Sequence, residues 1–146
     1  MKLSIALSTV PTKHPLRVVR TISDDIFENM SDDMKPLYAN CNFNPGSPPK
    51  LYLRALLLGV AYSIEAESQL LDHINFNLLF RWFVGLPVEA EIWDEEDFAN
   101  RRRQLVGSGL AEEFCMRTLN HPRVRRVINV DHPMLSSYKI NILSAF

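Results

Sequence analysis

Apolar residues in the first part of the chain recur at the spacing of an α-helix. Pro15 stands where a helix could begin, and four apolar residues follow at four-residue intervals: Val18, Ile22, Ile26 and Met30. Pro suits the first turn of a helix, and the spacing puts these side chains on one face. The pattern predicts a helix over roughly 15–30, with a short continuation near 34–37. Three Pro, one Gly and three Asn within 40–49 then predict a loop.

The middle of the chain is apolar on most faces of a helix. Ser47 before two prolines is typical of a helix start, and the apolar run over 51–64 predicts a central, buried helix. A bend near 63–65 precedes a second helical pattern over 65–74. A third short helix is predicted over 77–84, because Gly85 and then Pro87 form a common stop.

The last third begins with a capping pattern and ends without helical periodicity. Asp94, followed by an acidic residue three positions later, predicts the start of a helix that ends at Gly107. A last helix is expected over about 109–119. The segments 124–130 and 138–143 are rich in β-forming residues, but two such segments are too few for a sheet that stands alone.

These patterns predict an all-α fold with an irregular or β-prone tail. We expect a compact domain of five to six helices, in which the bend between 65–74 and 77–84 resembles a helix-turn-helix. The expected organisation is an N-terminal tail over 1–13, a helical domain over 14–119 and a separate remnant over 120–146.

Composition adds limits to this picture. The 146 residues are 47% hydrophobic and 23% charged, which suits a globular domain and excludes collagen-like and disordered chains. No apolar run approaches the ~20 residues of a membrane helix, so no membrane association is expected. Two distant cysteines, Cys41 and Cys115, indicate reduced thiols in a cytoplasmic protein and no zinc framework.

Charge is distributed unevenly along the chain. The net charge is −1, but residues 1–100 carry 8 basic and 14 acidic residues, whereas residues 101–146 carry 8 and 3. Seven arginines lie between Arg101 and Arg126, a density that suits phosphate binding because guanidinium forks match phosphate oxygens. The alternative is that acids at 94–97 and bases at 101–103 complement one helix dipole. Both interpretations stay open from charge alone.

Catalytic motifs are weak by comparison. The chain has no Gly-x-Ser-x-Gly motif and no phosphate loop, and its four histidines never pair at metal-ligand spacing. Adjacent carboxylates such as Asp24 and Asp25 diverge by ~100° on a helix and cannot easily share a metal. No metal site is therefore expected.

Two blocks carry a resemblance to a known family. Residues 53–70 (LRALLLGVAYSIEAESQL) and 77–86 (NLLFRWFVGL) resemble the N-terminal domain of bacterial insertion-sequence transposases of the InsH type, and the likeness covers about 14–119. The resemblance implies a helical module that binds double-stranded DNA at the terminal inverted repeats of a mobile element. The residues expected to contact DNA are Lys50, Arg54, Arg81, Arg101, Arg102 and Arg103.

The resemblance also implies a second domain after this module in full-length relatives. That domain is a DDE catalytic domain with an RNase H-like sheet, which needs Mg and whose first catalytic aspartate ends a strand in a Val-Asp-Gly-Thr setting. Asp131 occupies the corresponding place, but His132 and Pro133 replace Gly-Thr. Two-metal cleavage requires several carboxylates around ions ~4 Å apart, so we expect a truncated transposase without catalysis and without a cofactor.

The acidic start of the 94–107 helix and the missing catalytic domain leave alternatives open. The acidic residues at 95–97 repel phosphates, which weakens base reading by the start of that helix. The chain could instead be an interaction protein that associates with itself or inhibits an intact transposase, or it could be a non-functional relic.

Overall fold

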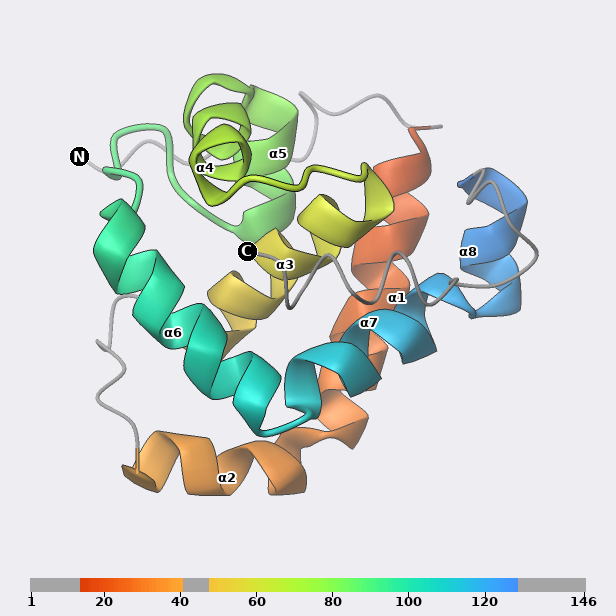
Figure 1. Ribbon diagram of the computed structural model, residues 1–146. Coiled ribbons are helices and arrows are strands. Elements are labelled where there is room, and N and C mark those ends of the chain that lie inside the picture. Colours follow the sequence, from red (N-terminus) through yellow and green to blue (C-terminus); the bar gives the residue numbers. More distant parts are fainter. Residues whose placement is uncertain (1–13, 41–47, 129–146) are drawn as a thin grey trace.

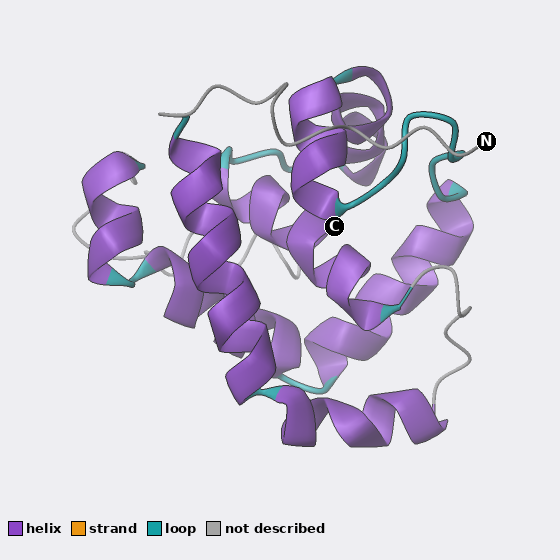
Figure 2. Cartoon of the chain, turned by 180° about the vertical axis from the view of Figure 1, so that it is seen from behind, coloured by secondary structure: helices purple, strands orange, loops and turns teal. Residues whose placement is uncertain are grey.

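The computed structural model describes residues 14–40 and 48–128, and these fold into a bundle of helices (Figure 1). Turns and short loops connect the helices, and the described residues contain no strand (Figure 2). The eight described helices are α1 (Pro15–Asn29), α2 (Ser31–Asn40), α3 (Pro49–Ala61), α4 (Glu67–Phe76), α5 (Leu78–Val84), α6 (Glu95–Gly107), α7 (Leu110–Leu119) and α8 (Pro122–Val127).

Helix α3 forms the centre of the bundle. Ten of its thirteen residues are buried, as expected for a helix that is apolar on most faces. Helices α4, α5, α6 and α7 all pack against it. This packing brings residues that are far apart in the sequence around one core (Figure 1).

Helix α1 covers a second side of the core through one apolar face. The face comprises Leu16, Val19, Ile22 and Ile26, all buried. This stripe packs against α7 and α8, while α2 continues the chain after Met30. The predicted first helix and its continuation are therefore two separate helices.

Local capping explains where several helices begin and end. Asn77 Oδ1 accepts hydrogen bonds from the backbone N–H groups of Leu79 and Phe80, so α5 starts directly after α4. Asp94 caps α6 as predicted. Gly85 ends α5 with φ of 101°, a left-handed conformation that favours glycine. A Cβ at Gly85 would also lie 3.0 Å from Arg54 Nη1.

The all-α fold class is confirmed, with more helices than expected. Eight helices are described instead of five to six. The β-prone interpretation of 124–130 is wrong over 124–127, which belong to α8. His121 Nδ1 accepts from the Arg123 N–H, Pro122 opens the helix, and Val124 is buried where α8 packs against α1 and α7. These tertiary contacts outweigh the local β propensity. The segment 138–143 lies outside the described residues.

Candidate nucleic-acid interface

Arg54, expected to contact DNA, lies inside the protein. Only 5% of the residue is exposed, and its two terminal nitrogens are engaged. Nη2 donates to Asp24 Oδ1 at 2.7 Å, and Nη1 donates to the Val84 carbonyl at 3.1 Å. The side chain thereby connects α1, α3 and the end of α5.

Arg81 is also buried and holds a loop in place. It is 5% exposed and donates four hydrogen bonds, to the carbonyl and side-chain oxygens of Asn75, to the Pro87 carbonyl and to the Ala90 carbonyl. These acceptors lie in α4 and in the loop after α5. The guanidinium group therefore fixes the connection from α5 towards α6 and is not available at the surface.

Arg102 forms a third buried cation. It is 6% exposed, and its Nε lies 3.5 Å from Glu67 Oε2 at the start of α4. Glu67 supplies the opposite charge that a buried cation needs, and the pair joins α6 to α4. Three of the six expected contact residues thus have their charged groups in the interior.

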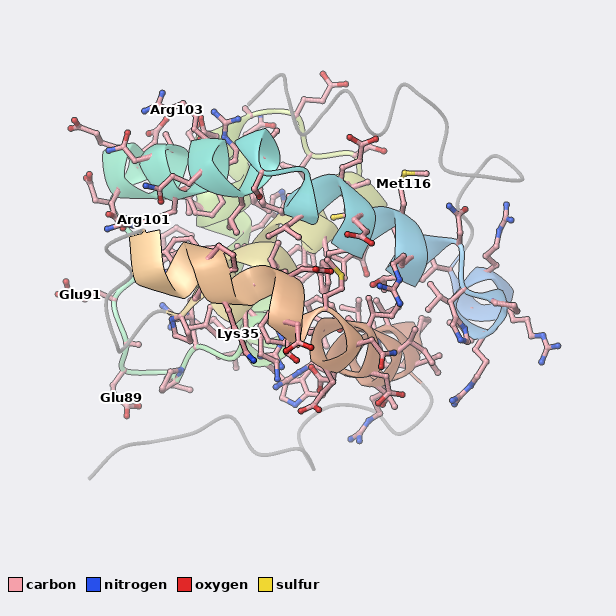
Figure 3. The ribbon with its side chains drawn as sticks, turned by 90° about the horizontal axis from the view of Figure 1, so that it is seen from below. Lys35, Glu89, Glu91, Arg101, Arg103 and Met116 are labelled. Atoms are coloured by element: carbon pink, nitrogen blue, oxygen red, sulfur yellow. The ribbon has the colours of Figure 1, made fainter. Side chains whose placement is uncertain are left out.

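Of the remaining expected residues, Lys50 and Arg101 are partly buried and Arg103 is exposed, and they do not form one cluster. Lys50 Nζ is 3.7 Å from Asp24 Oδ1, and Arg101 Nε is 3.6 Å from Asp97 Oδ1. Arg103 is exposed and donates to Asn100 Oδ1. Figure 3 shows Arg101 and Arg103 leaving α6 on opposite sides, as expected for residues ~200° apart around a helix.

Four exposed cations lie close together in the sequence at the end of α7 and on α8, where Arg123 and Arg125 are ~200° apart around the helix. We call this set the α8 basic surface, and it consists of Arg117, Arg123, Arg125 and Arg126. All four are exposed, and residues 114–128 contain no Asp or Glu. Arg117 also makes a 3.8 Å ion pair with Glu113. The arginine density of the sequence pointed to this region, but three of these arginines fall beyond the predicted helical domain.

The acidic residues of the α5–α6 loop and of the start of α6 lie elsewhere. Figure 3 shows Glu89 and Glu91 at the opposite end of the molecule from α8. Asp94, Glu95 and Glu96 are exposed at the beginning of α6. These acidic residues therefore lie away from α8, although Glu112 and Glu113 are close to it on α7.

The α4–α5 bend does not have the character expected of a helix-turn-helix. A single residue, Asn77, separates the two helices. Residues 80–84 of α5 are all buried, so this helix has few exposed side chains with which to read bases. Phe76 and Leu78, in contrast, are 80% and 60% exposed at the corner between the helices.

Cys115 is buried in α7, and burial raises the pKa of its thiol well above the usual range. The thiolate is the reactive form, so we expect this cysteine to be protected while the protein is folded. In a Cys41→Ser variant, alkylation of Cys115 should be slower in buffer than in urea by about three orders of magnitude or more. Mass spectrometry of timed samples measures both rates, and equal rates would contradict the buried position.

The same thiol makes stability depend on pH. Its pKa is higher in the folded than in the unfolded chain, so its contribution is complete below the unfolded pKa of about 8.5 and is lost as pH rises above it. We expect the free energy of unfolding to fall by about 1.4 kcal/mol for each pH unit above 9 from this group. A Cys115→Ala variant should lose this part of the slope in urea titrations at pH 8 to 10.

The described part of the chain offers neither a metal cluster nor a membrane helix. No group of three or more His, Cys, Asp or Glu side chains that could hold a metal ion occurs in 14–40 and 48–128. No described helix has the length and apolar character needed to span a membrane. Asp131 lies outside the described residues.

Comparison with known proteins gives a match to a family model. The model, described as a transposase domain (DUF772), matches residues 5–104, about two thirds of the chain. The match ends within α6, so α7 and α8 lie beyond it. No curated protein and no solved structure matches the chain.

Proposed function

Since the chain belongs to the DUF772 transposase-domain family, we propose that it is a DNA-binding, transposase-derived protein that recognises the terminal inverted repeats of an insertion sequence. The observation that carries the proposal is the α8 basic surface, which has four exposed arginines, of which one, Arg117, pairs with Glu113. Arginine forks suit phosphate oxygens, and clustered cations gain affinity by releasing counterions from DNA. In a bacterial cell such a protein would associate with the nucleoid.

The structure revises which arginines we assign to DNA. Arg54, Arg81 and Arg102 have buried charges with internal partners, so the proposal gives them the role of holding the domain together. Lys50, Arg101 and Arg103 stay as surface candidates, and the α8 basic surface is the main contact. The proposal gives no DNA contact to Asp94, Glu95 and Glu96, because carboxylates repel phosphates.

Selection of duplexes from a random library tests whether the protein recognises a specific DNA sequence. Purified full-length protein would be incubated with a library of duplexes that share fixed ends and carry a random central segment. Sequencing of the retained duplexes should show one enriched motif, and that motif should occur at both ends of the element that encodes the protein. Retention of the library without enrichment would contradict recognition of inverted repeats.

The contribution of the α8 basic surface is tested by charge removal. In an Arg123→Gln/Arg126→Gln variant, loss of two phosphate contacts should weaken binding at least about tenfold and lower the slope of log K against log salt by about 1.8. Fluorescence anisotropy on the selected duplex at several salt concentrations measures both quantities. Lys35→Gln removes an exposed charge of α2 and is expected to change affinity less than twofold. Equal effects of the two variants would contradict the assignment.

The proposal assigns binding, and no strand cleavage, to this chain. Incubation of the selected duplex with the protein and Mg²⁺ should leave both strands intact. Cleavage that is lost in an Asp131→Asn variant would contradict this part of the proposal and would give Asp131 a catalytic role.

A second proposal is association with another protein, either a second copy or an intact transposase. The exposed Phe76 and Leu78 favour it, because large apolar side chains at one corner often mark an interaction site. Light scattering of the chain alone and with a full-length transposase should then show a complex that a Phe76→Ser/Leu78→Ser variant does not form. A monomer in both experiments would contradict this second proposal.

A further inference from the structure

Arg20 lies in a groove between α1 and α5. Its Nη1 donates to the Trp82 carbonyl at 2.6 Å, and its guanidinium carbon lies 5.1 Å from the centre of the Trp82 ring. Among the described residues, this is the one hydrogen bond found for a group with five N–H donors. About a quarter of the side chain (24%) remains exposed.

Asp24 lies close to Arg20 and to two further cations. Asp24 accepts from Arg54 Nη2 at 2.7 Å, lies 3.7 Å from Lys50 Nζ, and lies 3.9 Å from Arg20 Nε. One carboxylate thus faces three positive charges. The pKa of Arg20 is lowered, first by burial and then by the nearby charge of Arg54, while Asp24 acts in the opposite direction. An additional anion would therefore be stabilised here.

A cavity of about 330 Å³ opens beside this cluster. Its lining residues are Arg17, Arg20, Thr21, Asp24 and Trp82. This volume is roughly ten times the ~30 Å³ that one water molecule occupies in the liquid, so it admits a tetrahedral anion together with water. The Thr21 hydroxyl donates to the Arg17 carbonyl at 3.0 Å, and Arg17 and Arg20 contribute the positive charge of the lining.

We propose that this cavity binds one phosphate group through the guanidinium groups of Arg17 and Arg20. Arginine matches phosphate oxygens with parallel N–H bonds, and Lys50 and Arg54 add positive charge behind the site. Asp24 holds Arg20 and Arg54 in position by balancing one of the charges. A phosphate occupying the cavity would be a second anion beside the three cations that share Asp24.

The position of the cavity connects it to DNA, and this step rests on the proposed function. Helix α1 packs against both α5 and α8 and lies between them (Figures 1 and 2). The cavity therefore flanks the same helix as the α8 basic surface. A backbone phosphate of bound DNA would fill the cavity, while the α8 arginines contact further phosphates.

The test monitors the Arg20 Nε–H signal in ¹H–¹⁵N spectra of the full chain, assigned by its loss in Arg20→Lys. Titration with inorganic phosphate, at constant ionic strength set with chloride, should shift this signal to saturation. Arg17→Gln should raise the dissociation constant for phosphate about tenfold, because it removes one fork of donors. Lys35→Gln makes the same change in net charge outside the site and should alter the constant less than twofold.

A second titration uses the selected DNA duplex and identifies the source of the phosphate. A shift of the Arg20 signal with both ligands, and competition between them, would support a backbone phosphate in the cavity. A shift with inorganic phosphate alone would support the phosphate site and overturn its assignment to DNA. The absence of a saturable shift with either ligand would overturn the whole inference.

The test of phosphate binding in the cavity and the test of the proposed DNA binding can fail independently. The Arg123→Gln/Arg126→Gln variant should bind inorganic phosphate at the cavity as the natural protein does, even though its DNA affinity is lower. If that variant keeps full DNA affinity, the assignment of DNA contacts to the α8 basic surface fails. The phosphate titration still shows whether the cavity binds phosphate. If the variant loses the phosphate shift, the cavity is not an independent site and the inference fails.

Discussion

Replacing Arg81 with methionine is expected to lower the free energy of unfolding by about 3–5 kcal/mol. Methionine keeps a flexible apolar stem but has no donors, so the oxygens of Asn75, Pro87 and Ala90 would lose the N–H groups that now bind them. These acceptors lie on both sides of α5. The change should therefore loosen the loop that leads to α6 as well as reduce global stability.

Urea unfolding monitored by circular dichroism measures this effect. Arg103→Met is the matched control, because Arg103 is exposed and its side-chain bond is to Asn100 within the same helix; its change should stay within about 0.5 kcal/mol. Arg81→Lys keeps the charge but not the planar fork and should fall between the two. A stability for Arg81→Met equal to that of Arg103→Met would show that the hydrogen bonds contribute little.

The second large effect is expected for Phe98→Ala, which should cost about 3–5 kcal/mol. Phe98 is fully buried, and its ring centre lies 5.5 Å from that of Trp93 and 6.0 Å from that of Tyr52. Tyr52 and Trp93 stack on each other at 4.4 Å. Removing the ring would leave a cavity where α6 packs on α3, because the stacked neighbours cannot fully collapse into it.

Phe76→Ala provides the comparison for Phe98. The same atoms are removed, but Phe76 is 80% exposed, so its loss should change stability by less than about 0.5 kcal/mol. Thermal unfolding of both variants, at one pH and one protein concentration, gives the difference directly. Similar melting temperatures for the two variants would contradict the buried aromatic cluster formed by Tyr52, Trp93 and Phe98.

The course of the helices was largely predictable from the sequence. The apolar faces of α1 and α3, the Asp94 cap and the Gly85 stop depend on residues that are close along the chain, and the structure contains all of them. The segment 124–127 was not predictable in this way. Its valines favour a strand locally, but burial of Val124 beside α1 and α7 makes it helical.

The candidate site was predictable only in part. The arginine-rich segment pointed to the region that contains the α8 basic surface, because charge density is visible in sequence. Charge density could not show which of the six expected contact residues are exposed and which are buried. Exposed Arg103 and buried Arg102 are neighbours in the chain, and only the packing of α6 against α4 shows that Arg102 faces Glu67.

The sequence by itself determined the family, the helical class and the presence of a basic segment, since each depends on residue identity or on short-range periodicity. The tertiary structure alone decided which cations are at the surface. Arg54 and Arg81 belong to the blocks that carry the family resemblance, yet their guanidinium groups bind carbonyls contributed by residues 6 to 30 positions away. Burial of a charge depends on where those distant partners lie, and only the folded chain places them.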